Sequence, residues 1–231
     1  MRFQNIIRLF MGAFFVCAVY TACGGISDPA QNHYNIDAVT DDIRGVISIT
    51  ELHWAGSVDN DGDYNKPDDC FIELYNGDIL PRSMKGWTVR FTDAAGKTLR
   101  LITLPEASIP SGGRYTIGRG TDGAFSYFDL CVPNMYIPKA HFRIRVQDPG
   151  GRTSDTVDFT KRDYLPGSAL PRERRSAVRF INSFNEPRGS GYDDWYVYNN
   201  HAAGAQDNIK TCYKSSMFCA PGRAKGATYL W

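Results

Sequence analysis

The segment that most constrains the fold is residues 70–75, because it is apolar on both faces. Successive side chains of a strand point to opposite faces of a sheet. One face would carry Cys70, Ile72 and Leu74, and the other Phe71, Glu73 and Tyr75. This pattern predicts a strand buried on both faces, in the middle of a sheet. The following Asn76-Gly77 predicts a turn, since glycine adopts positive φ freely.

Further strands are predicted along most of the chain, and no long helical periodicity appears. Residues 86–91 place Trp87, Val89 and Phe91 on one face and polar residues on the other, which predicts a half-buried strand. Residues 141–147 alternate most cleanly and should form a hairpin with residues 156–159. Other predicted strands are 46–54, 99–104, 114–117, 177–181 and 194–198. The sequence therefore predicts an all-β fold.

Four segments in order resemble the strand motifs of the lamin-tail domain family. They are Val46–Leu52, Phe71–Asn76, Gly86–Val89 and Ile109–Tyr115. The resemblance continues more weakly in residues 168–174, 194–195 and 220–222, and so covers roughly residues 46–226. It implies an immunoglobulin-like β-sandwich, as found at the end of nuclear lamins and in many bacterial exported proteins, with no generally assigned reaction. Residues 46–231 would form this domain, with an elaborated C-terminal segment.

The N-terminus has the pattern of a secretory signal peptide, residues 1–22. Arg2 and Arg8 precede an apolar run, residues 9–20, which is short for a membrane span. The Tyr20–Cys23 segment resembles a bacterial lipobox, in which Cys23 is lipidated and becomes the mature N-terminus. Tyr20 departs from the usual leucine, which leaves open ordinary secretion with a cut near Ala22 or an uncleaved anchor. Residues 23–45 would then be the lipidated N-terminus and a polar, flexible tether.

Four cysteines remain in the chain after Cys17 and Cys23 are set aside. They are Cys70, Cys131, Cys212 and Cys219. An even number in an exported chain predicts disulfides, and we expect Cys212 to pair with Cys219 and Cys70 with Cys131. The alternative is four reduced thiols, since cysteine is a good small core residue.

The charge balance gives little reason to expect nucleic acid as a partner. The formal net charge is +1, and removal of Arg2 and Arg8 leaves 24 basic residues against 25 acidic ones. A nucleic-acid-binding domain usually carries a basic patch and a clear positive charge. The local runs of charge, acidic at residues 59–69 and basic at 172–179, are consistent with solvated faces or with a docking patch.

Two acidic residues, Glu51 and Glu73, are the candidates for a catalytic pair. They lie on predicted strands that could be neighbours, and paired carboxylates are the machinery of acid–base hydrolysis. The competing interpretation is that each accepts hydrogen bonds from loop amides. No nucleophile elbow, Ser-x-x-Lys motif, paired-histidine zinc helix or phosphate loop appears in the sequence.

The loop Ser57–Asp68 is a candidate calcium site because it is dense in oxygen ligands. Asp59, Asp61 and Asp63 flank Gly62, but the register departs from an EF-hand at its first and last positions, and the flanks are strand-like. The competing interpretation is a solvated Asp/Gly turn. Otherwise no cofactor is predicted.

Aromatic residues are candidates for a sugar-stacking or protein-binding surface, and alternatively for core or rim packing. They are Tyr127, Phe128, Tyr136, Tyr192, Tyr196 and Tyr198. Taken together, the sequence predicts a lipoprotein of the bacterial cell envelope, anchored to a membrane through Cys23. It would act as a non-catalytic binding or structural module for a protein or glycan partner. The alternative is an envelope hydrolase acting on polysaccharide or nucleic acid through Glu51 and Glu73.

Overall fold

The computed structural model describes residues 43–63, 65–180, 187, 189–199 and 208–222. The predicted signal peptide, the lipidation site Cys23 and most of the predicted tether lie outside these ranges. Within them the chain is built of strands, with only short 3-10 turns, η2 (Tyr192–Asp194) and η3 (Thr211–Tyr213). The predicted all-β fold is confirmed. None of the helical turns in the described ranges has the length and apolar character that a membrane span requires.

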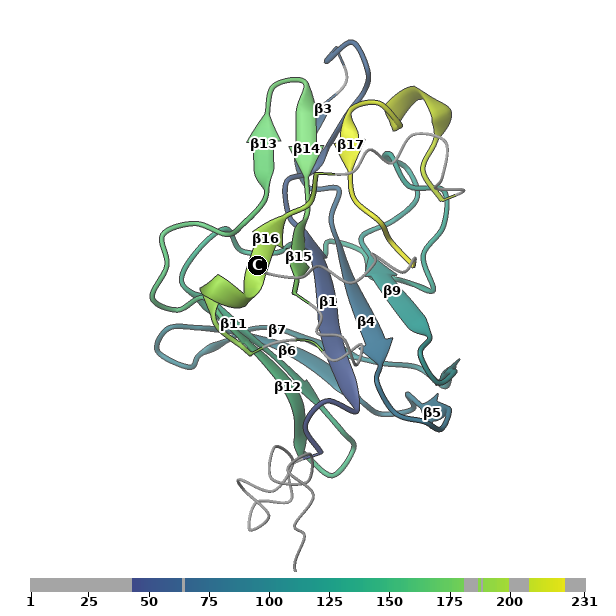
Figure 1. Cartoon of the computed structure of the whole chain (residues 1–231), viewed down its shortest axis with the longest axis vertical. Coiled ribbons are helices and arrows are strands. Elements are labelled where there is room, and N and C mark those ends of the chain that lie inside the picture. Colours follow the sequence, from purple (N-terminus) through teal and green to yellow (C-terminus); the bar gives the residue numbers. More distant parts are fainter. Residues whose placement is uncertain (1–42, 64, 181–186, 188, 200–207, 223–231) are drawn as a thin grey trace, which may run out of the picture. The chain divides into compact units, whose positions relative to one another are not determined.

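The larger sheet contains the strands that the sequence marked as most buried (Figure 1). Its order is β10-β9-β4-β1-β15-β16, which are Leu130–Cys131, Arg114–Gly118, Phe71–Asn76, Ile47–His53, Ala177–Arg179 and Trp195–Val197. Every residue of β1 and β4 is buried. The predicted central strand is therefore confirmed, with β1 on one side of β4 and β9 on the other.

The second sheet has the order β12-β11-β6-β7. Its strands are Thr153–Asp158, Phe142–Gln147, Thr88–Asp93 and Thr98–Thr103. The β11–β12 hairpin and the alternation along β11 are as predicted, with Phe142, Ile144 and Val146 fully buried. The outer strand β7 pairs with β6 as an antiparallel strand, and of its side chains only Ile102 is buried. As an edge strand it contributes little to the core.

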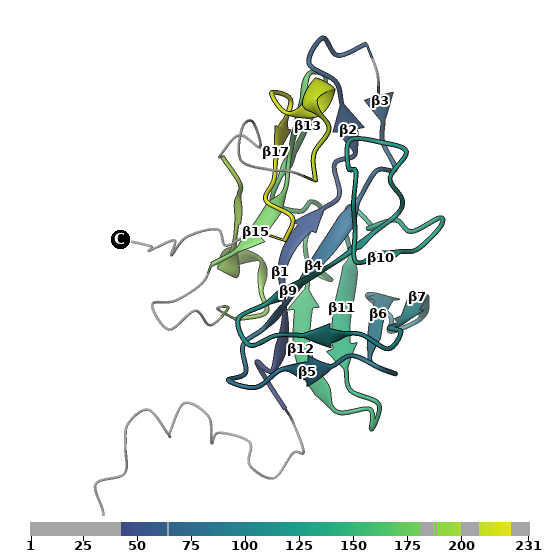
Figure 2. The same cartoon turned by 90° about the vertical axis from the view of Figure 1, so that its right-hand side faces the viewer.

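One apolar core lies between these two sheets. It joins β1 and β4 residues such as Ile49 and Ile72 with β6 and β11 residues such as Phe91 and Ile144. Because each sheet turns one face toward this cluster, burial of its side chains supplies the main driving force for folding. Figure 2 shows the strands of the second sheet beside β1 and β4.

Three smaller sheets complete the described residues. They are β13-β14-β17 (Ser168–Leu170, Glu173–Arg175, Met217–Phe218), β2-β3 (Ser57–Val58, Asn65–Lys66) and β5-β8 (Arg82–Ser83, Ser108–Ile109). Strands β13 and β14 lie at one end of the domain and β5 at the other (Figures 1 and 2). The C-terminal segment therefore contributes to two sheets: β15 and β16 extend the large one, and β17 pairs with β14.

A buried ion pair joins β15 of the large sheet to β12 of the second sheet. Arg179 Nη1 on β15 lies 2.6 Å from Asp155 Oδ2 on β12, and their side chains are 4% and 9% exposed. The same carboxylate accepts a hydrogen bond from the amide of Ile49 at 2.8 Å. Arg179 also donates to the Ile49 carbonyl and to Gly189. One carboxylate and one guanidinium thus join strands from both sheets.

Candidate functional site

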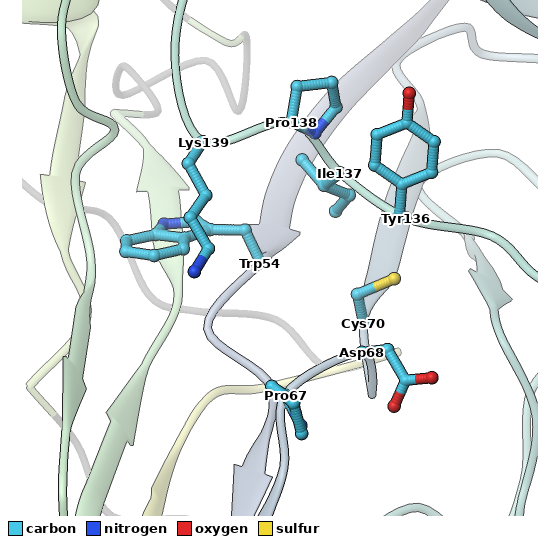
Figure 3. Close-up of a pocket in the computed structure, with 8 residues that line it drawn as sticks. All are labelled: Trp54, Pro67, Asp68, Cys70, Tyr136, Ile137, Pro138 and Lys139. Carbon is cyan, nitrogen blue, oxygen red and sulfur yellow. The ribbon is translucent and has the colours of Figure 1, made fainter.

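A cavity of about 310 Å³ opens where the chain leaves β1 (Figure 3). Its apolar wall is formed by Trp54, which directly follows β1, by Pro67 after β3, and by Ile137 and Pro138 from the β10–β11 connection. An apolar wall with a few polar groups is the usual composition of a ligand pocket.

Hydrogen bonds fix the wall in place. The Trp54 indole nitrogen Nε1 donates to the Pro166 carbonyl at 2.6 Å. Gly167 is required beside it, because its φ is +114° and an added Cβ would lie 2.7 Å from the same indole nitrogen. On the other side, the Cys70 thiol donates to the Met135 carbonyl at 3.5 Å. The indole ring is therefore held in one orientation before any ligand arrives.

Polar groups of three residues surround the opening: Asp68, Tyr136 and Lys139. Tyr136 is 47% exposed, and its hydroxyl points away from Cys70 and Asp68 (Figure 3). Asp68 pairs with Arg119 Nε at 2.9 Å, while Lys139 makes no ion pair with any residue that the structure describes. A ligand would therefore meet an ammonium group, a phenol and a partly neutralised carboxylate around an apolar surface.

The thiol in the cavity is not a nucleophile. Burial raises the pKa of Cys70 to about 12, and the carboxylates of Asp69 and Asp68 act in the same direction. Since the thiolate is the reactive form of cysteine, this side chain stays protonated and inert at neutral pH.

The predicted disulfide between Cys70 and Cys131 is wrong for this structure, which holds both residues as thiols. Phe71 and Cys131 are each the register partner of Gly118, on opposite sides of β9. Two strand spacings amount to roughly 9–10 Å, whereas bridged cysteines have Cα atoms at most about 7 Å apart. The intervening strand therefore keeps the two sulfurs apart.

The predicted pair Cys212–Cys219 is likewise not bridged in this structure. Cys212 is exposed in η3, whereas Cys219 is fully buried in a cluster with Phe71 and Phe125. The intervening strand β17 carries the chain from the surface into this cluster. Short sequence spacing suggested an easy bridge, but the strand places one sulfur in solvent and the other in the core.

The two candidate catalytic carboxylates lie on the neighbouring strands β1 and β4, where they are register partners, and both are fully buried. Glu51 Oε1 accepts a hydrogen bond from the Ala220 amide at 3.0 Å. Glu73 Oε2 accepts one from the Gly222 amide at 2.7 Å, and Glu73 Oε1 accepts from Thr50 Oγ1 at 2.5 Å and from Arg114 Nε at 3.2 Å. Burial against loop amides is the geometry of a structural role.

The acidic loop predicted as a candidate calcium site connects β2 and β3. Asp61 and Asp63 are exposed, and the Gly62 amide donates to the Asp59 carbonyl as in a turn. Nowhere in the described ranges do three or more His, Cys, Asp or Glu side chains converge as metal ligands would. The loop also contacts the C-terminal segment, because Ser216 Oγ donates to the Asp59 carbonyl at 2.7 Å.

The predicted aromatic surface is divided by the fold. Phe128 and Tyr198 are buried, Tyr192 and Tyr196 are half-buried, and Tyr127 and Tyr136 are exposed. Of these only Tyr136 lines the cavity. Sequence reasoning missed Trp54 and Lys139. The predicted strand 46–54 included Trp54, whereas β1 ends at His53 and leaves Trp54 half-buried at the cavity.

His53 is a further titratable group that sequence reasoning did not single out. It is fully buried, its ring stacks on Phe71 at 5.3 Å, and burial lowers its pKa to about 4. Nδ1 lies 2.9 Å from Ser176 Oγ and Nε2 lies 2.7 Å from the Gly56 carbonyl, so both ring nitrogens are engaged. The neutral ring is a packing element of the core.

No known protein family has a model that matches this chain, and no curated protein matches it. The lamin-tail resemblance therefore rests on the order of the strand motifs. The interpretation of the cavity rests on the chemistry of its own residues.

Proposed function

We propose that the chain is a lipid-anchored, non-catalytic binding module of the bacterial cell envelope, with an immunoglobulin-like sandwich of lamin-tail type. Support for the fold type is that the four motifs fall on or beside β1, β4, β6 and β8–β9 in order. Support for a non-catalytic role is that Glu51 and Glu73 are fully buried and bound to amides of the C-terminal segment. The hydrolase alternative has less support, because neither carboxylate lines the cavity.

The observation that supports a binding role is the cavity lined by Trp54 and Tyr136. The ligand that we propose for it is a glycan. Sugar rings have an apolar face of C–H groups that stacks on aromatic rings, and hydroxyl groups that bond to polar side chains. The rings of Trp54 and Tyr136 offer surfaces on which a sugar can stack. The side chains of Lys139 and Asp68 offer groups for hydrogen bonds to its hydroxyls. A ligand of mixed character fits this lining better than a wholly apolar one.

Binding is expected to depend on exposed side chains of the cavity. Tyr136→Ala combined with Lys139→Ala should weaken binding of soluble envelope glycan fragments at least about tenfold, through loss of stacking and hydrogen bonds. Titration of tryptophan fluorescence measures this affinity. The matched control is Tyr127→Ala, since Tyr127 is 56% exposed and does not line the cavity. Equal affinity of the double variant and the control would refute the cavity as the site, and capture of a protein instead of a glycan from envelope extracts would refute the ligand class.

Membrane attachment is expected to depend on Cys23. A diacylglyceryl thioether at this sulfur would hold an otherwise water-soluble domain at the membrane. Cys23→Ser should move the protein from the detergent phase to the aqueous phase and abolish labelling by radioactive palmitate. Cys17→Ser, in the apolar run, is the control that should leave both unchanged. An unlabelled Cys23→Ser protein that stays in the detergent phase would show that another feature is the anchor.

A further inference from the structure

Two large aliphatic side chains project into solvent from the connection between β4 and β5. Ile79 is 86% exposed and Leu80 is 59% exposed. Single exposed apolar residues are ordinary on protein surfaces. Here two stand next to each other at the tip of one loop, residues 77–81, and Ile79 is the most exposed large apolar side chain among the described residues.

This loop is held in one conformation by hydrogen bonds. Asn76 Nδ2 donates to the Leu80 carbonyl at 2.9 Å, and Asn76 Oδ1 accepts from the Asp78 amide at 3.0 Å. Asp78 in turn accepts from the Leu80 amide and pairs with Arg82, and its carbonyl accepts from Ser111 Oγ at 2.6 Å. The exposure of Ile79 and Leu80 is therefore imposed by a rigid frame.

The loop lies beside Ile43 and Val46, the N-terminal end of the described chain. The Gly77 amide donates to the Val46 carbonyl at 3.0 Å. Ile43, the first described residue, lines a cavity of about 320 Å³ together with Val46, Pro81 and Arg82. About 20 residues separate Ile43 from Cys23. Ile79 and Leu80 thus lie at the same end of the domain as Ile43, where the described chain begins.

We propose that Ile79 and Leu80 insert into the lipid surface to which the chain is anchored and so fix how the domain stands on the membrane. This inference rests on the proposed anchor at Cys23. Apolar side chains at an interface enter the boundary between headgroups and acyl chains. A loop already rigid in its bound form loses little entropy on insertion.

A second copy of the chain is a poorer occupant of this surface. Stable protein interfaces bury on the order of 1,000 Å² or more, whereas the large apolar side chains exposed on this loop are two neighbours, Ile79 and Leu80. Adjacent charges are also paired, Arg82 with Asp78 and Arg152 with Asp148. Insertion should therefore be driven by apolar burial, and vesicles of neutral phosphatidylcholine should bind with little dependence on salt.

The test uses the chain without residues 1–22 and with Cys23→Ser, so that neither the apolar signal segment nor a lipid contributes to binding. Flotation with phosphatidylcholine vesicles should recover this protein, and Ile79→Ser with Leu80→Ser should reduce the partition coefficient at least about tenfold. The control is Leu170→Ser, because Leu170 is 54% exposed on β13, at the far end of the domain from β5. Melting temperatures equal to that of the parent chain would show that both variants are folded.

A second variant, Leu80→Trp, reports insertion directly. Its fluorescence emission should shift to the blue on addition of vesicles and should be quenched by brominated acyl chains. Equal partitioning of the Ile79/Leu80 variant and the Leu170 variant would overturn the proposal. The proposal would also be overturned if the parent chain self-associates in sedimentation and does not bind vesicles, while the Ile79/Leu80 variant is monomeric. That result would assign the loop to a dimer interface. Both results are independent of whether Cys23 carries the anchor, which the palmitate experiment decides.

Discussion

Replacing Glu73 by Ala is expected to lower the free energy of unfolding by about 3–5 kcal/mol. The carboxylate is fully buried and pairs with Arg114 at 3.2 Å. The Arg114 side chain is only 11% exposed, so water replaces the lost ion pair poorly. The Gly222 amide and the Thr50 hydroxyl lose an acceptor at the same time. Urea denaturation followed by circular dichroism measures the change.

The matched control for this substitution is Glu106→Ala. Glu106 also faces a cation, Lys85 at 3.3 Å, but the two side chains are 79% and 71% exposed. Exposed ion pairs contribute at most about 1 kcal/mol, so this variant should unfold almost as the parent does. If the two variants unfold at the same urea concentration, the structural role assigned to Glu73 is wrong.

Arg179→Ala is expected to destabilise the domain by a similar amount, about 3–5 kcal/mol, because it leaves Asp155 buried without its cation. The matched control is Arg162→Ala. Arg162 also pairs with an aspartate and lies over an aromatic ring, 4.7 Å from the centre of Tyr192, yet its side chain is 45% exposed. Thermal unfolding of both variants compares a buried arginine with an exposed one.

A double replacement separates the ion pair from packing. Arg179→Met together with Asp155→Leu leaves no charge without a partner, so it should destabilise less than Arg179→Ala alone. A double variant that is less stable than the single one would show that the hydrogen bond that Asp155 accepts from the Ile49 amide outweighs the cost of leaving the Asp155 charge without its cation.

Strands with a strong local pattern could be predicted from the sequence. The apolar faces of residues 70–75 placed β4 in the middle of the large sheet, and the alternation of residues 142–147 gave β11. The prediction at residues 99–104 was right in type but did not give the exposure of β7, because an edge position depends on which strands pair and not on one strand's residues.

The site depended on contacts between distant segments, which a single sequence does not reveal. The cavity joins Trp54, Cys70 and Tyr136 from three parts of the chain. The pairing of Glu51 with Glu73 was predictable from adjacent strands, but the amides that satisfy them come from Ala220 and Gly222. The cysteine pairings were wrong because sequence spacing carries no information on the strand that separates Cys70 from Cys131.

The docking of residues 220–222 on the two buried glutamates has a consequence for the order of folding. The hydrogen bonds span 169 residues, from Glu51 to Ala220, and 149 residues, from Glu73 to Gly222. Contacts so distant in sequence form slowly, and until they form the central strands β1 and β4 carry carboxylates that lack these amide donors. When the chain is synthesised from its N-terminus, these two carboxylates therefore gain their amide donors only after residues 220–222 have been made.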